Sequence, residues 1–353
     1  MTSPVFVHLR VHSEYSLCDG LLRIKQLVRA AVDAGMPAVA LTDQSNLFAL
    51  VRFYRAALAA GIKPVIGVDC WIRDPDDANK PFRMVLLVQN NQGYRNLTRL
   101  VSRSYQEGQH LGVPMLQRDW LRGASAGLIA LSGGREGDLG QALLHGHPEQ
   151  AEHLLDGWLA LFGDRYYLEL IRTGREGEED CLHLSVELAA RRGLPVVATN
   201  DVRFLEASDF EAHETRVCIH DGRTLDDPRR PRRYSEQQYL RSSEEMAELF
   251  ADIPEALENT VEIAKRCTLE LTLGKNYLPE FPIPEGMTTG EFFKAESRRM
   301  IAQGLADMVA THGIDRLTAD EPNRLRTYTR EMEVVEILDS VFSTVRRIAR
   351  TVG

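Results

Sequence analysis

Apolar residues along this chain alternate between short unbroken runs and runs with helical spacing. Ile24, Leu27, Val28 and Ala31 fall at i, i+3, i+4 and i+7, which predicts an amphipathic helix. A fully apolar run at 38–41 follows and predicts a buried strand. Because the same succession of helix and strand recurs over the first 205 residues, we expect an α/β fold there.

Seven strands are predicted. The connection between the third and fourth is short and polar, which favours a hairpin over a helical crossover. Seven strands alternating with helices favour a distorted (β/α) barrel, with a doubly wound open sheet as the alternative. The predicted strands cover 5–9, 38–41, 65–68, 84–88, 127–131, 166–171 and 195–199. The predicted helices begin near Ile24 and Leu47 and then cover 93–106, 148–162, 179–192, 243–250 and 254–266.

Beyond residue 209 the pattern changes to helices and loops, and no strand-like run recurs. A proline-rich stretch at 279–284 predicts a domain boundary. We therefore assign 1–278 to a barrel domain with a helical extension. Residues 279–353 are assigned to a linker and a mostly helical C-terminal segment, too short for a separate core.

Composition limits the classes of function. With 44% hydrophobic and 26% charged residues, the 353-residue chain is typical of a globular protein, and its net charge of -9 argues against a surface that is basic throughout. Five scattered cysteines with no CxxC pair indicate a reducing compartment without a disulfide framework or zinc ribbon. No secretory signal or 18-residue apolar run occurs, so we predict a cytoplasmic protein with no membrane span.

The opening of the chain carries the most informative group of polar side chains. The first predicted strand leads His8, Arg10, His12 and Asp19 into one turn, and barrel enzymes place their sites at such strand ends. A lone histidine on an apolar segment is more often a core residue than a ligand. Asp43 has two readings as well, as a site residue or as the cap of a helix near Asn46.

An arginine-rich loop also has two interpretations. It could contact template or duplex phosphates in a salt-sensitive manner, or it is a solvated loop whose charge Asp226 and Asp227 partly offset. The residues of this loop that could contact nucleic acid are Arg229, Arg230, Arg232 and Arg233.

Five motifs occur in order along the chain. They are HLRVHS at 8–13 with DG at 19–20, LTDQSNL at 41–47, GIKP at 61–64, LSGG at 131–134 and ATNDVRF at 198–204, and LDDP at 225–228 and DIPEA at 252–256 follow. Together they resemble the N-terminal PHP (polymerase and histidinol phosphatase) region of the bacterial DNA polymerase III alpha subunit. The likeness is closest to the proteobacterial branch and runs from about residue 4 to about residue 335.

The resemblance implies a fold and an activity. It implies a PHP-type seven-stranded barrel, in agreement with the strand count, at the start of a replicase that extends primed DNA with deoxynucleoside triphosphates. In that family the catalytic aspartates hold Mg²⁺ in a palm domain, which is expected to begin near residue 286 and continue beyond this chain. We therefore expect no polymerase activity, catalytic residue or cofactor in this fragment. Past about residue 340 the sequence departs from the pattern of the family, which suggests that the fragment is truncated.

The resemblance also implies partners and a site. The expected partners are the proofreading exonuclease subunit, docked by the barrel, and other replisome subunits. At the positions where metal-active PHP domains bind metals, the chain keeps His12, Asp19, Asp69 and Asp201. It carries other side chains at the remaining ligand positions, namely Arg10, Gln44, Arg83, Gly134 and Arg203.

These replacements predict a barrel without bound metal. A guanidinium group has no available lone pair and stays protonated, so it repels a divalent cation instead of binding it. We expect the arginines to form charge-assisted hydrogen bonds with Asp19, Asp69 and Asp201 in place of metal–carboxylate bonds. The alternatives are an active metal-dependent PHP phosphoesterase and an interaction scaffold without enzymatic activity.

Overall fold

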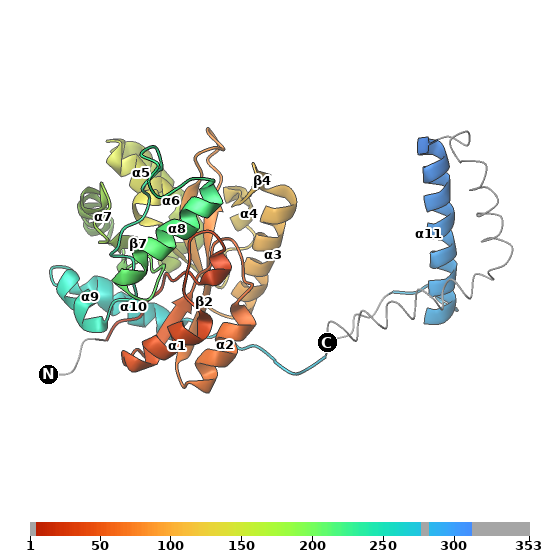
Figure 1. The fold of residues 1–353 in the computed structure, drawn as a ribbon, viewed down its shortest axis with the longest axis horizontal. Coiled ribbons are helices and arrows are strands. Elements are labelled where there is room, and N and C mark those ends of the chain that lie inside the picture. The colour runs from red at the N-terminus through yellow and green to blue at the C-terminus, as the bar shows by residue number, and fades with distance from the viewer. Residues whose placement is uncertain (1–4, 277–281, 313–353) are drawn as a thin grey trace. The chain divides into compact units, whose positions relative to one another are not determined.

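The computed structural model describes residues 5–276 and 282–312. The chain divides into two compact units, Met1–Thr272 and Leu273–Gly353. The first holds a mixed sheet surrounded by helices, and of the second the structure describes one long helix, α11 (Thr289–His312) (Figure 1). Most of the region predicted to begin the palm, including all of 313–353, lies outside the described residues.

Within its described residues, the first unit contains eight assigned strands and ten α-helices, besides four short 3₁₀ helices. The strands are β1 Ala38–Leu41, β2 Lys63–Ile72, β3 Phe82–Val88, β4 Gln109–His110, β5 Val113–Leu116, β6 Leu128–Leu131, β7 Tyr166–Ile171 and β8 Val196–Thr199. The helices are α1 Ile24–Asp33, α2 Leu50–Ala59, α3 Asn91–Glu107, α4 Arg118–Leu121, α5 Asp138–Leu144, α6 Pro148–Phe162, α7 Glu178–Arg192, α8 Phe210–Asp221, α9 Ser243–Leu249 and α10 Pro254–Arg266.

The sheet confirms the predicted α/β class. Its strand order is β4-β5-β2-β3-β6-β7-β8, and β1 also pairs with β2. The pairs β1·β2, β6·β7 and β7·β8 are parallel, whereas β2 and β3 form the predicted antiparallel hairpin. The β4–β5 hairpin was not predicted, because two very short strands leave almost no periodic signal.

The segment predicted as the first strand, 5–9, is extended but is not a regular strand. The amide of Val7 donates to Thr260 Oγ1 (3.2 Å) and that of Val11 to Thr42 Oγ1 (2.9 Å). Because side-chain hydroxyl groups take these amides, no continuous backbone ladder forms, and the prediction of a strand was wrong in this respect.

The same segment nevertheless joins the two free sides of the sheet. The carbonyl of His8 accepts from the amide of Ala40 in β1 (2.8 Å), and the carbonyl of Arg10 accepts from the amide of Val202, which follows β8 (3.1 Å). The amide of His12 in turn donates to the Val202 carbonyl (2.9 Å). The segment and six strands (β1, β2, β3, β6, β7 and β8) thus make a seven-membered barrel circuit.

Alternating side chains give the barrel two cores. The larger core packs one face of the strands against the helices. The smaller contains the opposite residues of β1, β2, β3, β6, β7 and β8 together with Ile263 and Ala264 of α10 and Cys267, which follows α10. Strand alternation carries this inward face from Val65 on β2 to Asp69, and from Tyr167 on β7 to Glu169. The barrel interior is therefore apolar at one end and charged at the other.

The helices follow the sequence prediction where the apolar stripe is long. Helices α3, α6, α7, α9 and α10 lie within two residues of the predicted spans. The amide of Glu245 donates to the Ser242 hydroxyl group, and that of Ser242 donates to the Glu245 carboxylate, so α9 begins with a capping box. No helix among the described residues has the length and apolar character needed to cross a bilayer.

Candidate functional site

The charged end of the barrel brings together the side chains that the sequence singled out. Arg10 and His12 come from the first extended segment, Asp69 from β2 and Arg83 from the start of β3. Asp19, Asp201 and Arg203 lie on the loops at the same end, and all seven side chains are at most about 7% exposed. The structure therefore brings these seven side chains together in one cluster.

One carboxylate oxygen, Asp69 Oδ2, receives most of the contacts. It accepts hydrogen bonds from Arg10 Nε at 2.9 Å and from His12 Nε2 at 3.0 Å. Arg10 Nη2 lies 2.8 Å and Arg83 Nη1 3.2 Å from the same atom. Two guanidinium groups and an imidazole thus surround a single oxygen, and all four side chains are nearly inaccessible to solvent.

Asp201 and Arg203 extend the cluster to Asp19. Arg203 Nη2 donates to Asp201 Oδ1 at 2.7 Å, and its Nη1 lies 2.5 Å from Asp19 Oδ2. Asp201 adopts a positive φ of 44°, a conformation that costs most L residues strain and that Asp tolerates better than others. Its carboxylate holds this position through Arg203, Arg10 at 3.2 Å and the amide of Gln238 at 2.8 Å.

Sequence reasoning missed several members of the cluster. Glu169 accepts from Thr199 Oγ1 at 2.5 Å and lies 3.3 Å from Arg10 Nη1, while Arg175 lies 3.4 Å from Asp201 Oδ2. The other missed residues are Glu136, Tyr234 and Gln238. A usable signal existed only for Glu169, a charged residue in the otherwise apolar run of β7.

Each guanidinium group of the cluster contacts at least two carboxylates. The carboxylates belong to Asp19, Asp69, Glu136, Glu169, Glu178 and Asp201, and the guanidinium groups to Arg10, Arg83, Arg175 and Arg203. In a low-dielectric interior, charges of opposite sign in contact offset the large cost of removing each of them from water. This pairing is the condition for keeping so many charges buried.

The ionisation of the acids follows from these contacts. Burial alone raises the pKa of Asp19, but Arg203, His12 and Arg83 together lower it to about 2. Burial likewise opposes ionisation of Asp69, yet Arg10 and Arg83 hold its pKa well below the usual range. Burial dominates at Glu169 and raises its pKa, although Arg10 acts in the opposite direction.

Two other predicted ligand positions have different roles. Gln44 accepts a hydrogen bond from Arg83 Nη1 through its side-chain oxygen and donates to the Asp69 carbonyl, so it positions the cluster from outside. Gly134 has a φ of 54°, and a Cβ there would lie 2.9 Å from Ile171 Cδ1. A ligand side chain at position 134 would therefore have a strained backbone conformation and would require Ile171 to shift.

Asp43 does not cap a helix. Its carboxylate accepts from the amide and hydroxyl group of Ser13 and from the Ser16 hydroxyl group at 2.9 Å. Since α2 begins only at Leu50, Asp43 instead fixes the turn that carries His12.

Three side chains of the cluster could in principle offer ligand atoms to one divalent metal ion. Among the residues that the structure describes, His12, Asp69 and Asp201 form the one group of His, Cys, Asp and Glu donors within 4.8 Å of one another. Arg10 Nε lies 2.9 Å from Asp69 and 3.2 Å from Asp201, between the two carboxylates. A permanent cation therefore stands where a shared metal would bind, and the set does not fit one.

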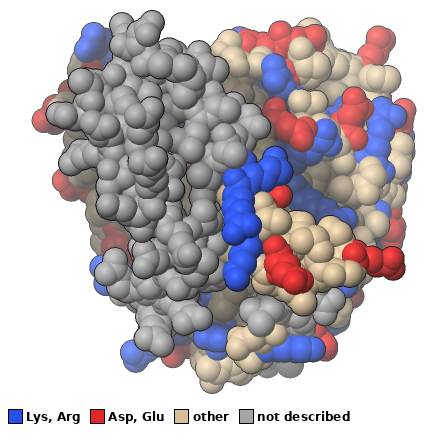
Figure 2. Space-filling view, turned by 90° about the vertical axis from the view of Figure 1, so that its right-hand side faces the viewer, with Lys and Arg blue, Asp and Glu red and all other residues tan. Residues whose placement is uncertain are grey.

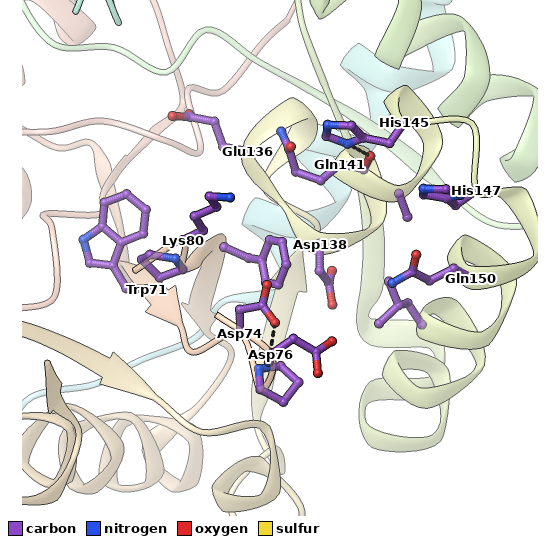
Figure 3. Close-up of a pocket in the computed structure, with 15 residues that line it drawn as sticks. Trp71, Asp74, Asp76, Lys80, Glu136, Asp138, Gln141, His145, His147 and Gln150 are labelled. Atoms are coloured by element: carbon purple, nitrogen blue, oxygen red, sulfur yellow. Dashed lines mark hydrogen bonds between the residues drawn. The ribbon is translucent and has the colours of Figure 1, made fainter. Parts of the chain in front are cut away.

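A cavity of about 560 Å³ lies beside the cluster. Asp74 and Asp76 from the β2–β3 connection face His145 and His147 at the end of α5 across it (Figure 3). Glu136 lines both this cavity and the pocket of about 620 Å³ over Asp19 and Arg83. The two histidines and two aspartates do not belong to the donor group described above.

The arginine-rich loop is largely neutralised by its surroundings. Arg229 pairs with Asp227 at 3.3 Å, Arg233 with Asp221 at 2.9 Å, and Arg230 with Glu214. These contacts favour the interpretation as a solvated loop. Contact of Arg229, Arg230, Arg232 and Arg233 with nucleic acid stays a prediction.

Two buried histidines lie beside the cluster. His8 Nε2 contacts the Arg241 carbonyl at 2.9 Å, and His213 Nε2 contacts the Asp19 carbonyl at 3.1 Å. Burial lowers the pKa of each to about 4. His8 is thus a core residue, as a lone histidine on an apolar segment was expected to be.

Comparison with known proteins finds one domain family and several bacterial proteins that resemble this chain. Residues 8–173 match the PHP domain family. The alpha subunit of DNA polymerase III from Pseudomonas fluorescens is 56% identical over 292 residues, which cover 83% of this chain and 25% of that protein. The Escherichia coli K12 subunit is 50% identical over 348 residues, which cover 99% of this chain and 29% of that protein. The Vibrio cholerae subunit is 48% identical over 305 residues, covering 86% and 26%.

The chain spans about a quarter of the length of these relatives. The Escherichia coli alignment extends past residue 335, where we expected the resemblance to end. That expected limit was therefore wrong, since the likeness continues across nearly the whole chain.

Removing Arg10 should leave uncompensated charge in the barrel. We expect Arg10→Met to lower the free energy of unfolding by about 3–5 kcal/mol, because Asp69 and Asp201 would stay buried without their shared cation. Urea denaturation followed by circular dichroism measures this. The matched control is Arg29→Met, which breaks an 84%-exposed pair with Asp33 and should cost less than about 0.5 kcal/mol. Equal losses would contradict the role given to Arg10.

Stability should fall as the solution becomes acidic. His8 and His213 have folded pKa values near 4 against 6.5 for the free side chain, so between these pH values the unfolded state binds more protons. The contribution of the two histidines to the free energy of unfolding is complete above pH 6.5. It declines toward pH 4, by on the order of 3 kcal/mol for each histidine. Urea denaturation from pH 7 to 4.5 gives the free energy of unfolding at each pH. Its slope against pH should correspond to about two protons, and in His8→Gln to about one fewer. An unchanged slope in that variant would contradict the assignment.

Proposed function

We propose, starting from the PHP domain at residues 8–173, that this chain is the N-terminal part of the alpha subunit of a bacterial replicative DNA polymerase. The intact protein extends a primed DNA template with deoxynucleoside triphosphates. The barrel itself is a structural and docking domain that works without a bound metal.

One observation carries the proposal for the barrel, the position of Arg10 between Asp69 and Asp201. Hydrolysis at a PHP-type centre needs metal ions that activate water and polarise a phosphate. Here the carboxylates that such ions would bind are paired with guanidinium groups instead. Arg83 and Arg203 add positive charge to the same space. The arrangement stabilises the barrel but offers no electrophile and no metal-bound water.

The polymerase chemistry is assigned to the part of the intact protein that this chain does not include. Phosphoryl transfer by two metal ions requires clustered aspartates that bind Mg²⁺. The aspartates of the barrel are instead committed to arginines. We therefore place polymerase catalysis, the Mg²⁺ requirement and the binding of primer, template and nucleotide outside this fragment, which has no polymerase activity of its own.

The partners follow from the same assignment. A rigid barrel braced by a buried ion-pair network is suited to hold a second protein in a fixed position. The proposed occupant is the proofreading exonuclease subunit, with further replisome subunits bound by the intact protein. The support for these partners is the identity of 48–56% to alpha subunits.

A metal-dependent phosphoesterase is the second candidate, supported by the grouping of His12, Asp69 and Asp201. We expect the purified chain, dialysed against Mn²⁺ or Zn²⁺ and desalted, to retain far less than one metal per molecule by plasma mass spectrometry. It should also release no phosphate from p-nitrophenyl phosphate. Metal-dependent turnover that disappears in Asp201→Asn would reverse the order of the two candidates.

Docking can be measured directly. The 353-residue chain and the proofreading exonuclease of the same organism should co-elute as a one-to-one complex in size-exclusion chromatography with light scattering. The controls are each protein run alone and the exonuclease mixed with an unrelated acidic protein. Separate elution at micromolar concentrations of both proteins would contradict the docking role.

A further inference from the structure

A groove of about 760 Å³ lies between α1 and α2, away from the buried cluster. Its cations are Arg23 and Lys25 at the start of α1 and Arg52 and Arg55 on α2, and Glu14 is its one acidic lining residue. All four cations are exposed. The groove therefore concentrates positive charge in a chain whose net charge is -9.

These cations differ from several exposed arginines elsewhere in the fold, which have carboxylate partners. Arg29 pairs with Asp33 at 3.6 Å, Arg103 with Glu107 at 2.8 Å, and the arginine-rich loop is neutralised as described above. On the face drawn in Figure 2, blue and red side chains are likewise intermixed where they are coloured. Within the described residues, none of the four groove cations forms an ion pair, and Arg52 donates instead to the Tyr15 hydroxyl group at 2.5 Å.

The other walls of the groove are suited to flat, partly apolar groups. Tyr15 is half-buried and presents its ring under the Arg52 guanidinium group, 5.8 Å from the ring centroid. Ile24 and Ala56 complete the apolar part of the lining. Guanidinium groups bind phosphate oxygens in a fork geometry, and aromatic or apolar walls accept bases without regard to sequence.

We propose that the α1–α2 groove, through Arg23, Lys25, Arg52 and Arg55, binds the backbone of single-stranded nucleic acid. The four cations neutralise consecutive phosphates, and Tyr15 provides a stacking surface beside them. An acidic peptide would meet the same four charges. The choice of nucleic acid rests on the proposed polymerase function, whereas the anionic character of the ligand rests on the groove alone.

The test uses the 353-residue chain and a fluorescein-labelled dT20 oligonucleotide, with fluorescence anisotropy measured from 25 to 200 mM NaCl. Four phosphate contacts to a single strand predict a slope of log K against log salt near about -3. The triple variant Arg23→Gln, Lys25→Gln, Arg55→Gln should bind at least roughly tenfold more weakly at the lowest salt and reduce the slope to about -1. Arg52 is kept because it also contacts Tyr15.

The matched control is Arg29→Gln, Arg103→Gln, Arg229→Gln, which removes the same charge from arginines that already have carboxylate partners. It should bind like the unmodified chain. Circular dichroism and thermal unfolding should show both variants folded. Equal weakening in the two variants, no weakening in the groove variant, or displacement of dT20 by poly-glutamate at equal charge concentration would each overturn the proposal. Since no DNA synthesis is measured, its failure leaves the proposed polymerase function untouched.

Discussion

The architecture of the barrel depends on how one oxygen atom, Asp69 Oδ2, is satisfied. Arg10 and His12 reach it from the first extended segment and Arg83 from β3, so their positions are mutually fixed. A buried carboxylate without partners would be strongly destabilising, while a carboxylate with three donors tolerates complete removal from water. The first extended segment is held to β2 and β3 at this point by charge, whereas β2 and β3 are also joined to each other by a regular antiparallel ladder.

The same strands line both the apolar and the charged end of the barrel interior. Their side chains keep alternating between the two faces of the sheet where apolar residues give way to charged ones. Val65 and Asp69 share one face of β2, and Tyr167 and Glu169 share one face of β7. The first segment departs from this rule, since Val7 and Leu9 belong to the inner core although Arg10 and His12 reach the cluster. Its interrupted backbone pairing permits that shift of one residue, which a regular strand would forbid.

Much of this fold could be predicted from periodicity, but the cluster only in part. Long amphipathic helices such as α3 and α7 and the apolar strand β8 carry their signal in neighbouring residues, and motif resemblance located Asp69 and Arg203. The partners of these residues could not be found in this way. Arg175 and Glu136 stand in loops and short turns whose paths are set by tertiary contacts, and the obstruction at Gly134 arises from Ile171, which is remote in sequence. The arginine-rich loop also pairs with residues outside it, Glu214 and Asp221. A count of charges within the loop alone therefore overstated how many of its arginines are free to bind a ligand.

The pairing of buried acids with guanidinium groups also constrains how such a barrel can change over generations. A substitution that introduces one metal ligand at position 10 removes a cation without supplying the remaining donors that an ion needs. Such a variant leaves uncompensated charge in its interior, which is strongly destabilising. Single substitutions of the buried arginines are therefore disfavoured unless their acidic partners change as well.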